Sequence, residues 1–372
     1  MDFPLIDNQR ALAEACARIA DSPWVALDTE FTRERTFYAR LGLLQLATAD
    51  FVACIDPLRV DLAPLLERLY DPRLLKVLHA GRQDLEVFHD LRGAVPGPVF
   101  DTQIAAALLG HSEQIGYGAL VEAIVGVRLP KAHTRTNWEA RPLSAEQLRY
   151  AHDDVWYLRD VYRALAERLE QRGRTAWLRE ECEALTDPAL YRTDPAEAHR
   201  RLPGHALPPA AQPVLRALAH WRERTAQAEN RPRGWVVADA ALLEIARSVP
   251  ATVDALARLP VSAGTVRRYG ADIVSVVQDA RRQPPERIWP APAPPSAREQ
   301  ELLRRLLAHV KAVAEMHEIS PTLLATRRSV VLLMSERSGP LARGWRRELI
   351  GTELLELIDA AAPYGERAGN SR

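Results

Sequence analysis

Residues 24–31 read Trp-Val-Ala-Leu-Asp-Thr-Glu-Phe, and they combine a predicted core strand with two acids. The first four residues are apolar and contain no turn former, which predicts a buried strand. Asp28 and Glu30 lie two positions apart, so in an extended chain they project to the same face. Two carboxylates this close repel each other unless a cation lies between them, and Mg²⁺ prefers oxygen ligands. Taken alone, the pair fits a solvated strand end better than a metal site, so a functional role depends on partners elsewhere in the chain.

The composition bounds the class of protein. A chain of 372 residues favours two or three domains, and 47% hydrophobic with 26% charged residues is typical of a soluble globular protein. We expect no membrane span, because no window approaches 18 uninterrupted apolar residues. The N-terminus lacks a basic region followed by an apolar core, and Cys16, Cys54 and Cys182 form no paired framework. A cytoplasmic location is therefore expected.

The net charge of zero conceals an uneven distribution. Residues 1–200 carry 24 basic and 31 acidic side chains, whereas residues 201–372 carry 25 basic and 18 acidic ones. This asymmetry suggests that the second half attracts a polyanion while the first holds a metal-type site. Ordinary surface composition can also produce a difference of this size.

The first half of the chain alternates predicted strands and helices. A helix over 8–20 precedes the strand at 24–27, and strands over 41–47 and 51–55 follow it closely enough to predict a three-stranded meander. Further on, we expect helices over 62–70, 82–88 and 103–109 and strands over 74–78 and 99–100. This pattern predicts an α/β fold with a mixed sheet.

Two more acids lie on these elements. Asp84 falls in the first turn of the helix after strand 74–78, where it could equally cap the helix. A long helix is expected from about 144 to 172, and it places Tyr150 and Asp154 one turn apart on one face. The polar, basic loop over 129–138 could close over a phosphate backbone or be plain surface.

The second half is predicted to be helical. A proline-rich linker is expected over 187–213, then helical segments over 213–285 and 296–362 with a second proline-rich stretch between them. The two segments resemble each other: Arg231-Pro232 matches Ser320-Pro321, and Arg267-Arg268 matches Arg346-Arg347. This similarity predicts a duplicated small helical module.

Three short motifs carry a resemblance to a known family. Leu-Asp-Thr-Glu-Phe at 27–31, His-Ala-Gly-Arg-Gln-Asp-Leu at 79–85 and Tyr-Ala-His-Asp-Asp at 150–154 resemble the DEDD exonucleases that carry a tyrosine in the last motif. Arg-Thr-Asn-Trp at 135–138 and Arg-Pro-Leu at 141–143 are similar flanks, whereas Arg82-Gln83 departs from the small or acidic residues expected there. The helical modules resemble HRDC domains, so nearly the whole chain resembles the ribonuclease D family.

The resemblance implies three domains and an activity. The expected domains are a ribonuclease H-like α/β exonuclease domain over 1–200 and all-α HRDC-like domains over 207–287 and 296–365. The implied activity is 3′→5′ removal of single nucleotides from RNA by two divalent ions, Mg²⁺ or Mn²⁺. The implied substrates are tRNA precursors with 3′ extensions, and the implied oligomeric state is a monomer.

The same resemblance assigns roles to the five site residues. Asp28 would bridge both ions, Glu30 and Asp154 would complete the first, and Asp84 would support the second through water. Tyr150 would orient the attacking water, because a phenol with a pKa of about 10 is a poor base at neutral pH.

Substrate contacts are expected around these acids and in the basic half. Thr29, Phe31, Lys131 and Arg135 are predicted to touch the RNA, while His79 is expected to be a buried structural histidine. The predicted RNA-gripping side chains of the second half are Arg222, Arg224, Arg231, Arg233, Arg267 and Arg268, although a solvated face is the alternative. Trp221 and Trp235 are expected to pack in the module core rather than stack on bases.

Two other functions fit the same residues. A DNA 3′→5′ exonuclease of the same superfamily would carry the same acids, because they do not report the sugar. A nucleic-acid-binding scaffold with little catalysis is the second alternative, and the helical modules could also bind protein.

Overall fold

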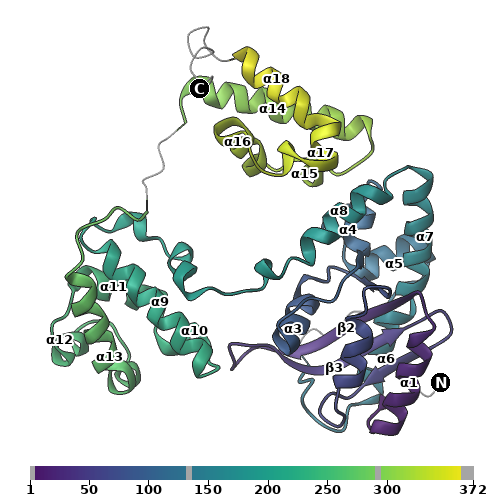
Figure 1. Cartoon of the computed structure of the whole chain (residues 1–372), viewed down its shortest axis with the longest axis horizontal. Coiled ribbons are helices and arrows are strands. Elements are labelled where there is room, and N and C mark those ends of the chain that lie inside the picture. Colours follow the sequence, from purple (N-terminus) through teal and green to yellow (C-terminus); the bar gives the residue numbers. More distant parts are fainter. Residues whose placement is uncertain (1–4, 131–135, 290–294, 362–372) are drawn as a thin grey trace. The chain divides into compact units, whose positions relative to one another are not determined.

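The computed structural model describes residues 5–130, 136–289 and 295–361 (Figure 1). The chain divides into two compact units. Unit 1 comprises residues 1–30, 41–188 and 294–372, and unit 2 comprises residues 31–40 and 189–293. Lys131 and Arg135, two of the predicted substrate contacts, lie outside the described residues.

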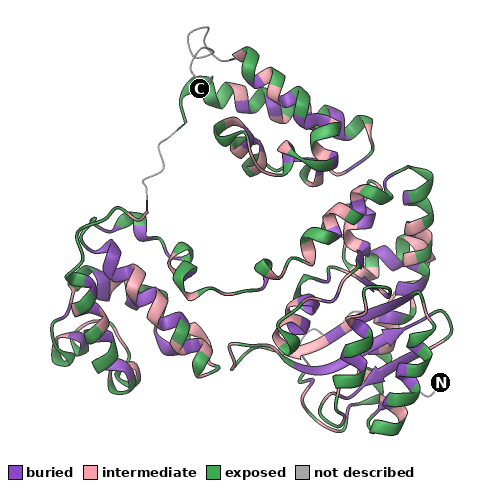
Figure 2. Ribbon diagram, in the orientation of Figure 1, coloured by how far each residue is buried: buried purple, intermediate pink, exposed green. Residues whose placement is uncertain are grey.

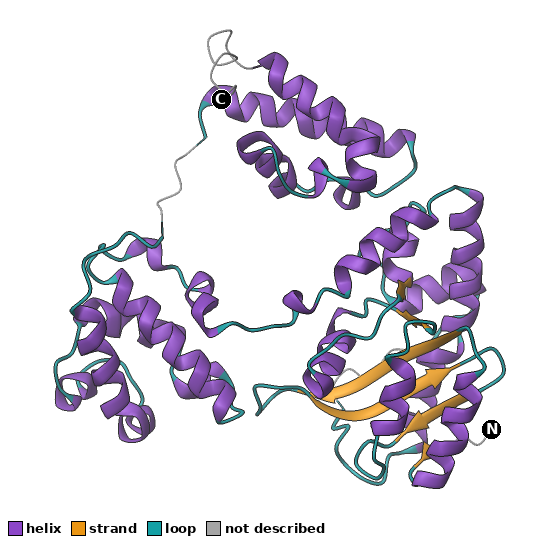
Figure 3. Cartoon of the chain, in the orientation of Figure 1, coloured by secondary structure: helices purple, strands orange, loops and turns teal. Residues whose placement is uncertain are grey.

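A mixed sheet of six strands forms the centre of unit 1, as Figure 3 shows. Its order is β1-β4-β3-β2-β5-β6, with bounds Leu5–Ile6, Val52–Ile55, Arg40–Ala47, Trp24–Thr32, Leu75–Leu78 and Val99–Asp101. β3 and β4 are antiparallel, whereas β1–β4, β2–β5 and β5–β6 are parallel pairs. The predicted meander is confirmed as three neighbouring strands, and the short edge strand β1 is an addition that the sequence analysis missed.

Strand β2 lies in the middle of the sheet, and its sequence explains why. Residues 24–27 are apolar and almost fully buried, as expected for a strand covered on both faces (Figure 2). The strand continues through Asp28 and Glu30 to Thr32, so both acids stand on regular strand backbone. The strand is therefore five residues longer than the predicted 24–27.

Helices cover the sheet and extend unit 1 (Figure 1). Their bounds are α1 Gln9–Ala20, α2 Ala63–Leu69, α3 Arg82–Arg92, α4 Thr102–Leu108, α5 Tyr117–Val125, α6 Ala145–Trp156, α7 Leu158–Gln171 and α8 Thr175–Leu185. The C-terminal part of the unit contains α14 Ala297–Met316, α15 Pro321–Leu324, α16 Arg327–Glu336, α17 Gly344–Arg346, the π-helical turn η5 Arg347–Gly351 and α18 Thr352–Ala361.

The single long helix predicted over 144–172 is wrong. The structure has two helices, α6 and α7, that meet at Tyr157. Arg159 Nε donates a hydrogen bond to the Trp156 carbonyl oxygen at 3.0 Å. In a continuous α-helix that carbonyl would accept from the amide of Asp160, which here donates to the Tyr157 carbonyl oxygen at 3.1 Å. The start of α6 is as expected, since Ser144 and Gln147 form a capping box.

Unit 2 is helical, with α9 Gln212–Ala228, α10 Arg233–Val236, α11 Asp239–Ser248, α12 Val253–Ala257 and α13 Ala263–Arg281 around an apolar core. The proline-rich stretch before α9 is more than a linker. Ala198, Leu202 and Leu207 are buried in the same core as α9 because this stretch forms 3₁₀ turns against that helix. Of the two tryptophans expected in the core, Trp221 packs against it, whereas Trp235 is 52% exposed and contradicts the prediction.

The two C-terminal helical segments share an order of elements. In each, a long helix is followed by a one-turn helix at a proline, α10 after Pro232 and α15 from Pro321. A ten-residue helix comes next, and α11 and α16 both end at a residue with positive φ, Val249 and Arg337. Throughout the residues described, no helix combines the length and apolarity that a membrane crossing requires.

Candidate active site

Three carboxylates converge at the middle of the sheet. Asp28 and Glu30 project from β2, and Asp154 lies on α6. Each offers an oxygen, and these oxygens all lie within 4.8 Å of one another. The spacing of two along the strand and the packing of one helix face therefore bring together three of the predicted site residues.

The fourth acid, Asp84, reaches the same region through Thr29. Asp84 is only 8% exposed, and its Oδ1 accepts hydrogen bonds from the Thr29 amide at 3.1 Å and the Thr29 hydroxyl at 2.5 Å. Asp84 is not the cap of α3, because its carboxylate points to β2 instead. The Thr29 amide and hydroxyl both donate to Asp84, and a contact between Thr29 and the RNA stays a prediction.

The turn between β5 and α3 fixes the start of that helix. Asp101 at the end of β6 accepts hydrogen bonds from the amides of Ala80 and Gly81 at 3.2 and 2.9 Å. A Cβ on Gly81 would lie 2.6 Å from the Leu78 Cβ, so only glycine allows the helix to begin this close to the strand. Asp101 also caps α4, because its side chain accepts hydrogen bonds from the Gln103 and Ile104 amides.

Burial is the main cause that raises the pKa values of all four acids, and for Asp28 and Glu30 the charges of the other site acids add to it. Burial and the charges of Asp154 and Asp84 raise the pKa of Glu30 to about 8. Burial, followed by repulsion from Asp154, Asp84 and Glu30, holds the pKa of Asp28 well above its ordinary value. Burial raises the pKa of Asp154 to about 7 and that of Asp84 to about 6, despite hydrogen bonds from Tyr150 and Thr29 that oppose the shifts.

This arrangement fits a divalent cation. Asp154 Oδ2 is buried and has no hydrogen-bond partner within the described chain. In that same part of the chain, no lysine or arginine pairs with any of the four acids. An uncompensated group of carboxylates costs free energy, and hard cations with oxygen ligands remove that cost.

Tyr150 borders the acids from α6. Its hydroxyl is hydrogen-bonded to the Asp154 carboxylate one turn later. Burial and the charges of Asp154, Glu30 and Asp28 raise the pKa of Tyr150 above its ordinary value. The phenol therefore keeps its proton at neutral pH and can orient a neighbouring group without removing a proton from it.

Other predicted residues lie apart from this group. His79 is structural, as expected: its ring nitrogens contact Thr102 Oγ1 at 3.0 Å and the Ile115 carbonyl oxygen at 3.1 Å. Phe31 follows Glu30 directly on β2, and its contact with the RNA stays a prediction. Tyr117 is a further neighbour of the acids that was not predicted, and its pKa is raised by burial and by the charges of Asp154 and Asp28. No pattern in the sequence marks Tyr117, because it belongs to another helix, α5.

Most of the arginines predicted to grip RNA have carboxylate partners. Arg222 is buried and pairs with Asp239 at 2.6 Å, and Arg233 pairs with the buried Glu223 at 2.5 Å. Arg231 and Arg268 both lie within 4 Å of Glu229. The prediction is wrong for Arg222, which is buried, whereas RNA contacts by Arg231, Arg233 and Arg268 stay a prediction. Within the described residues, Arg224 and Arg267 form no ion pair.

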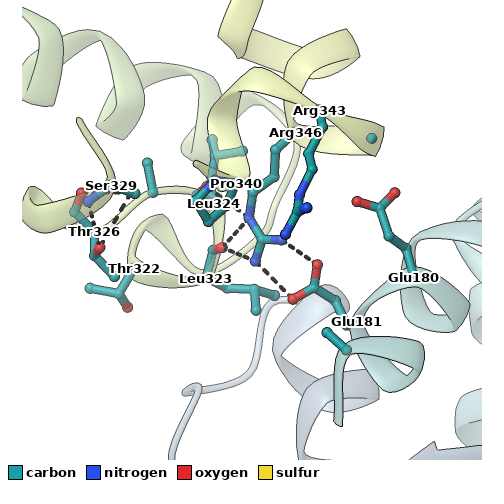
Figure 4. Close-up of a pocket in the computed structure, with 13 residues that line it drawn as sticks. Glu180, Glu181, Thr322, Leu323, Leu324, Thr326, Ser329, Pro340, Arg343 and Arg346 are labelled. Atoms are coloured by element: carbon teal, nitrogen blue, oxygen red, sulfur yellow. Dashed lines mark hydrogen bonds and ion pairs between the residues drawn. The ribbon is translucent and has the colours of Figure 1, made fainter. Parts of the chain in front are cut away.

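A cavity of about 530 Å³ lies between α8 and the C-terminal helices of unit 1 (Figure 4). Arg346 forms an ion pair with Glu181 and donates to the Leu323 and Leu324 carbonyl oxygens at 2.7–3.1 Å. The Trp345 indole nitrogen also donates to Glu181 at 2.8 Å, and its ring stacks on Trp177 at 4.7 Å. These contacts compensate the charges of Arg346 and Glu181 within unit 1.

Comparisons with known proteins place this site in a family. A family profile described as 3′–5′ exonuclease matches residues 3–170, and an HRDC domain profile matches residues 211–277. Ribonuclease D of Gluconacetobacter diazotrophicus is 42% identical, over 98% of this chain and 95% of the relative. Ribonuclease D of Pseudomonas paraeruginosa is 40% identical, over 96% and 97% of the two chains.

Solved structures agree with these sequence matches. The crystal structure of Escherichia coli RNase D, described as an exoribonuclease involved in structured RNA processing, aligns with a TM-score of 0.87 at 34% identity. That alignment covers 97% of this chain and 99% of the other. The catalytic core of RRP6 from Trypanosoma brucei, with a TM-score of 0.60 at 22% identity, shares the fold. The ribonuclease H-like exonuclease fold followed by a helical HRDC domain is thus confirmed, and the chain belongs to the ribonuclease D family of metal-dependent 3′–5′ exoribonucleases.

Proposed function

We propose that this enzyme hydrolyses the last phosphodiester bond at RNA 3′ ends through Asp28, Glu30, Asp84, Asp154 and Tyr150. The observation that carries the proposal is the convergence of three carboxylates within 4.8 Å around a buried, unpartnered oxygen of Asp154. Two Mg²⁺ or Mn²⁺ ions would neutralise charge on the phosphate and lower the pKa of the attacking water. Asp28, Glu30 and Asp154 would hold these ions directly, and Asp84 would do so through water.

Two residues keep this arrangement in place. Thr29 fixes Asp84 by two hydrogen bonds, so the carboxylate keeps one orientation relative to β2. Tyr150 stays protonated and orients the water for attack on the phosphorus. A nucleotide with a 5′-phosphate leaves, and the shortened RNA keeps a free 3′ hydroxyl.

We propose that the substrates are tRNA precursors with 3′ extensions. We further propose that the enzyme acts as a monomer in the cytoplasm. The support for the substrates is the family and the similarity to E. coli RNase D, which is described as acting in structured RNA processing. The three free cysteines are all buried, which suits a reducing compartment.

End-labelled RNA tests the reaction and its direction. With Mg²⁺ or Mn²⁺ we expect mononucleotides to be released stepwise from the RNA 3′ end, and EDTA to stop the release. Matched DNA serves as the control, because a faster reaction on DNA would favour the DNA exonuclease alternative. Products from internal cleavage would contradict the proposed mechanism.

We also propose a place where unit 2 contacts the RNA. A groove of about 790 Å³ lies along α9 and α13, and its lining includes Arg224, His220 and Trp221. Arg216, which pairs with Glu286 at 3.1 Å, and Asp279 also line it, so Arg224 is the cation proposed to meet the RNA. Arg216, His220 and Arg224 follow one another at intervals of four residues, so they lie on one helix face. Cations beside a partly buried aromatic ring suit a phosphate backbone with bases that can stack.

Substitution of Arg224 tests this groove. Because one phosphate contact is removed, Arg224→Gln should raise the KM for long RNA about three- to tenfold. The slope of log affinity against log salt concentration should become shallower by about one. The kcat should not change. Arg247→Gln on α11 is the matched control, since Arg247 already pairs with Glu244. Equal KM values for both variants would remove the groove from the binding surface.

The domain boundaries remain a prediction. We propose that residues 1–200 act as the exonuclease domain and that residues 207–287 and 296–365 are two HRDC-like modules. The support for the second module is its element order, since α14, α15 and α16 repeat the sequence of α9, α10 and α11.

A further inference from the structure

The segment just before α6 is held by one side chain, Arg141. Its Nε and Nη2 donate to the two oxygens of Asp56 at 2.6 and 2.7 Å. Its Nη1 donates to the Trp138 and Ala140 carbonyl oxygens at 2.8 and 2.9 Å, and Nη2 also donates to the Gly42 carbonyl oxygen at 2.7 Å. A guanidinium has five N–H donors, and here all five have acceptors.

This bonding gives Arg141 a structural task. With every donor used and Asp56 only 2% exposed, the guanidinium has no donor left for an RNA phosphate. The planar fork instead ties the end of β4, where Asp56 lies, to strand β3 and to the segment 138–141. Arg141 therefore sets where this segment lies against the sheet.

The side chain that the segment presents to the sheet is Trp138. It is 4% exposed and packs directly on Gly42 of β3. A Cβ on Gly42 would lie 2.8 Å from both the Cβ and the carbonyl oxygen of Trp138, so glycine is needed for this approach. Trp138, Leu43 and Cys54 form one apolar cluster, and Tyr150 packs against it.

The Trp138 ring is also a neighbour of the Tyr150 ring. The two ring centroids are 6.1 Å apart with an angle of 32° between the planes. One side of Tyr150 is thus backed by Trp138, while its hydroxyl is bonded to Asp154. A shift of Trp138 would leave the Tyr150 ring without this support and free its hydroxyl to move.

We propose that Arg141, through Asp56 and Trp138, is a positioning residue that holds the Tyr150 hydroxyl in its reactive place. The inference rests on the proposed role of Tyr150 in hydrolysis. Misplacing a reacting group by about 1 Å can lower the rate about a hundredfold. A small shift of Trp138 is therefore enough to lower turnover.

A double-mutant cycle tests the proposal. Arg141→Lys keeps the charge but loses the fork, and we expect kcat to fall about 10- to 100-fold with KM for RNA and the affinity for Mn²⁺ nearly unchanged. In a Tyr150→Phe background the same substitution should cost less than about threefold, because the hydroxyl that it positions is absent. Arg128→Lys, at an exposed ion pair with Glu122, is the matched control and should leave kcat unchanged.

The outcomes distinguish the role of Tyr150 in hydrolysis from the positioning role of Arg141. If Tyr150→Phe alone leaves kcat unchanged, the proposed role of Tyr150 fails and the positioning inference fails with it. If Tyr150→Phe lowers kcat but the two losses multiply in full, Tyr150 acts as proposed and Arg141 has a purely structural role. Should Arg141→Lys not fold, the cycle is run with Trp138→Leu, and Trp138→Phe should restore most of the turnover.

Discussion

Replacing Asp28 with asparagine will lower kcat by about a thousandfold or more while it raises the stability of the metal-free protein. Asp28 is repelled by all three other acids, since the charges of Asp154, Asp84 and Glu30 each raise its pKa. Its proposed place as the ligand shared by both ions means that the change removes at least about 4 kcal/mol of transition-state stabilisation. The same change removes one of several repelling carboxylates, so the folded state without metal gains stability.

Single-turnover kinetics on end-labelled RNA and thermal unfolding in EDTA at pH 8 measure the two effects. The control is Asp160→Asn, at a surface pair with Arg163 on α7, which should change neither quantity. Opposite signs for activity and stability are the signature of a functional site that strains the fold. A variant that loses activity and stability together would argue that Asp28 serves the fold instead.

Without metal, the protein will lose stability as the pH rises from about 5 to about 8. The folded-state pKa values of Asp84, Asp154 and Glu30, about 6, 7 and 8, all lie above the values near 4 expected in the unfolded chain. In this window the folded state binds more protons than the unfolded state, so the free energy of unfolding falls with increasing pH. Adding Mg²⁺ replaces those protons and reverses the loss.

Chemical unfolding at a series of pH values, with EDTA and with Mg²⁺, measures the effect. At a hundred times its dissociation constant, the metal should add about 2.7 kcal/mol. A Glu30→Gln, Asp154→Asn double variant should show a flatter pH profile in EDTA and a much smaller response to Mg²⁺. A wild-type profile that is the same with and without EDTA would contradict the metal site.

Much of the exonuclease site follows from local spacing. Asp28 and Glu30 share a face because side chains alternate along a strand, and Tyr150 and Asp154 share one because a helix turns every 3.6 residues. The capping box at Ser144 and the turn at Gly81 are equally local. Comparison of the motifs then gave the family, which geometry along the chain could not supply.

The remaining features depend on pairing between distant residues. Asp84 could be predicted as a helix cap, but in the structure it accepts a hydrogen bond from Thr29, 55 positions away. Four of the six arginines predicted to contact RNA are paired with carboxylates. The proline-rich stretch before α9 contributes buried side chains to the core of unit 2.

Interactions within a few residues fix the strand and the helices that carry the acids, so these elements and their order can be read from the amino-acid sequence. Which charges are compensated depends on tertiary packing. Arg141 illustrates the difference, because three of its five acceptors, the two Asp56 oxygens and the Gly42 carbonyl, lie 85 and 99 positions away. Whether a charged side chain is free for a ligand depends on neighbours that packing brings close, and no local pattern records them.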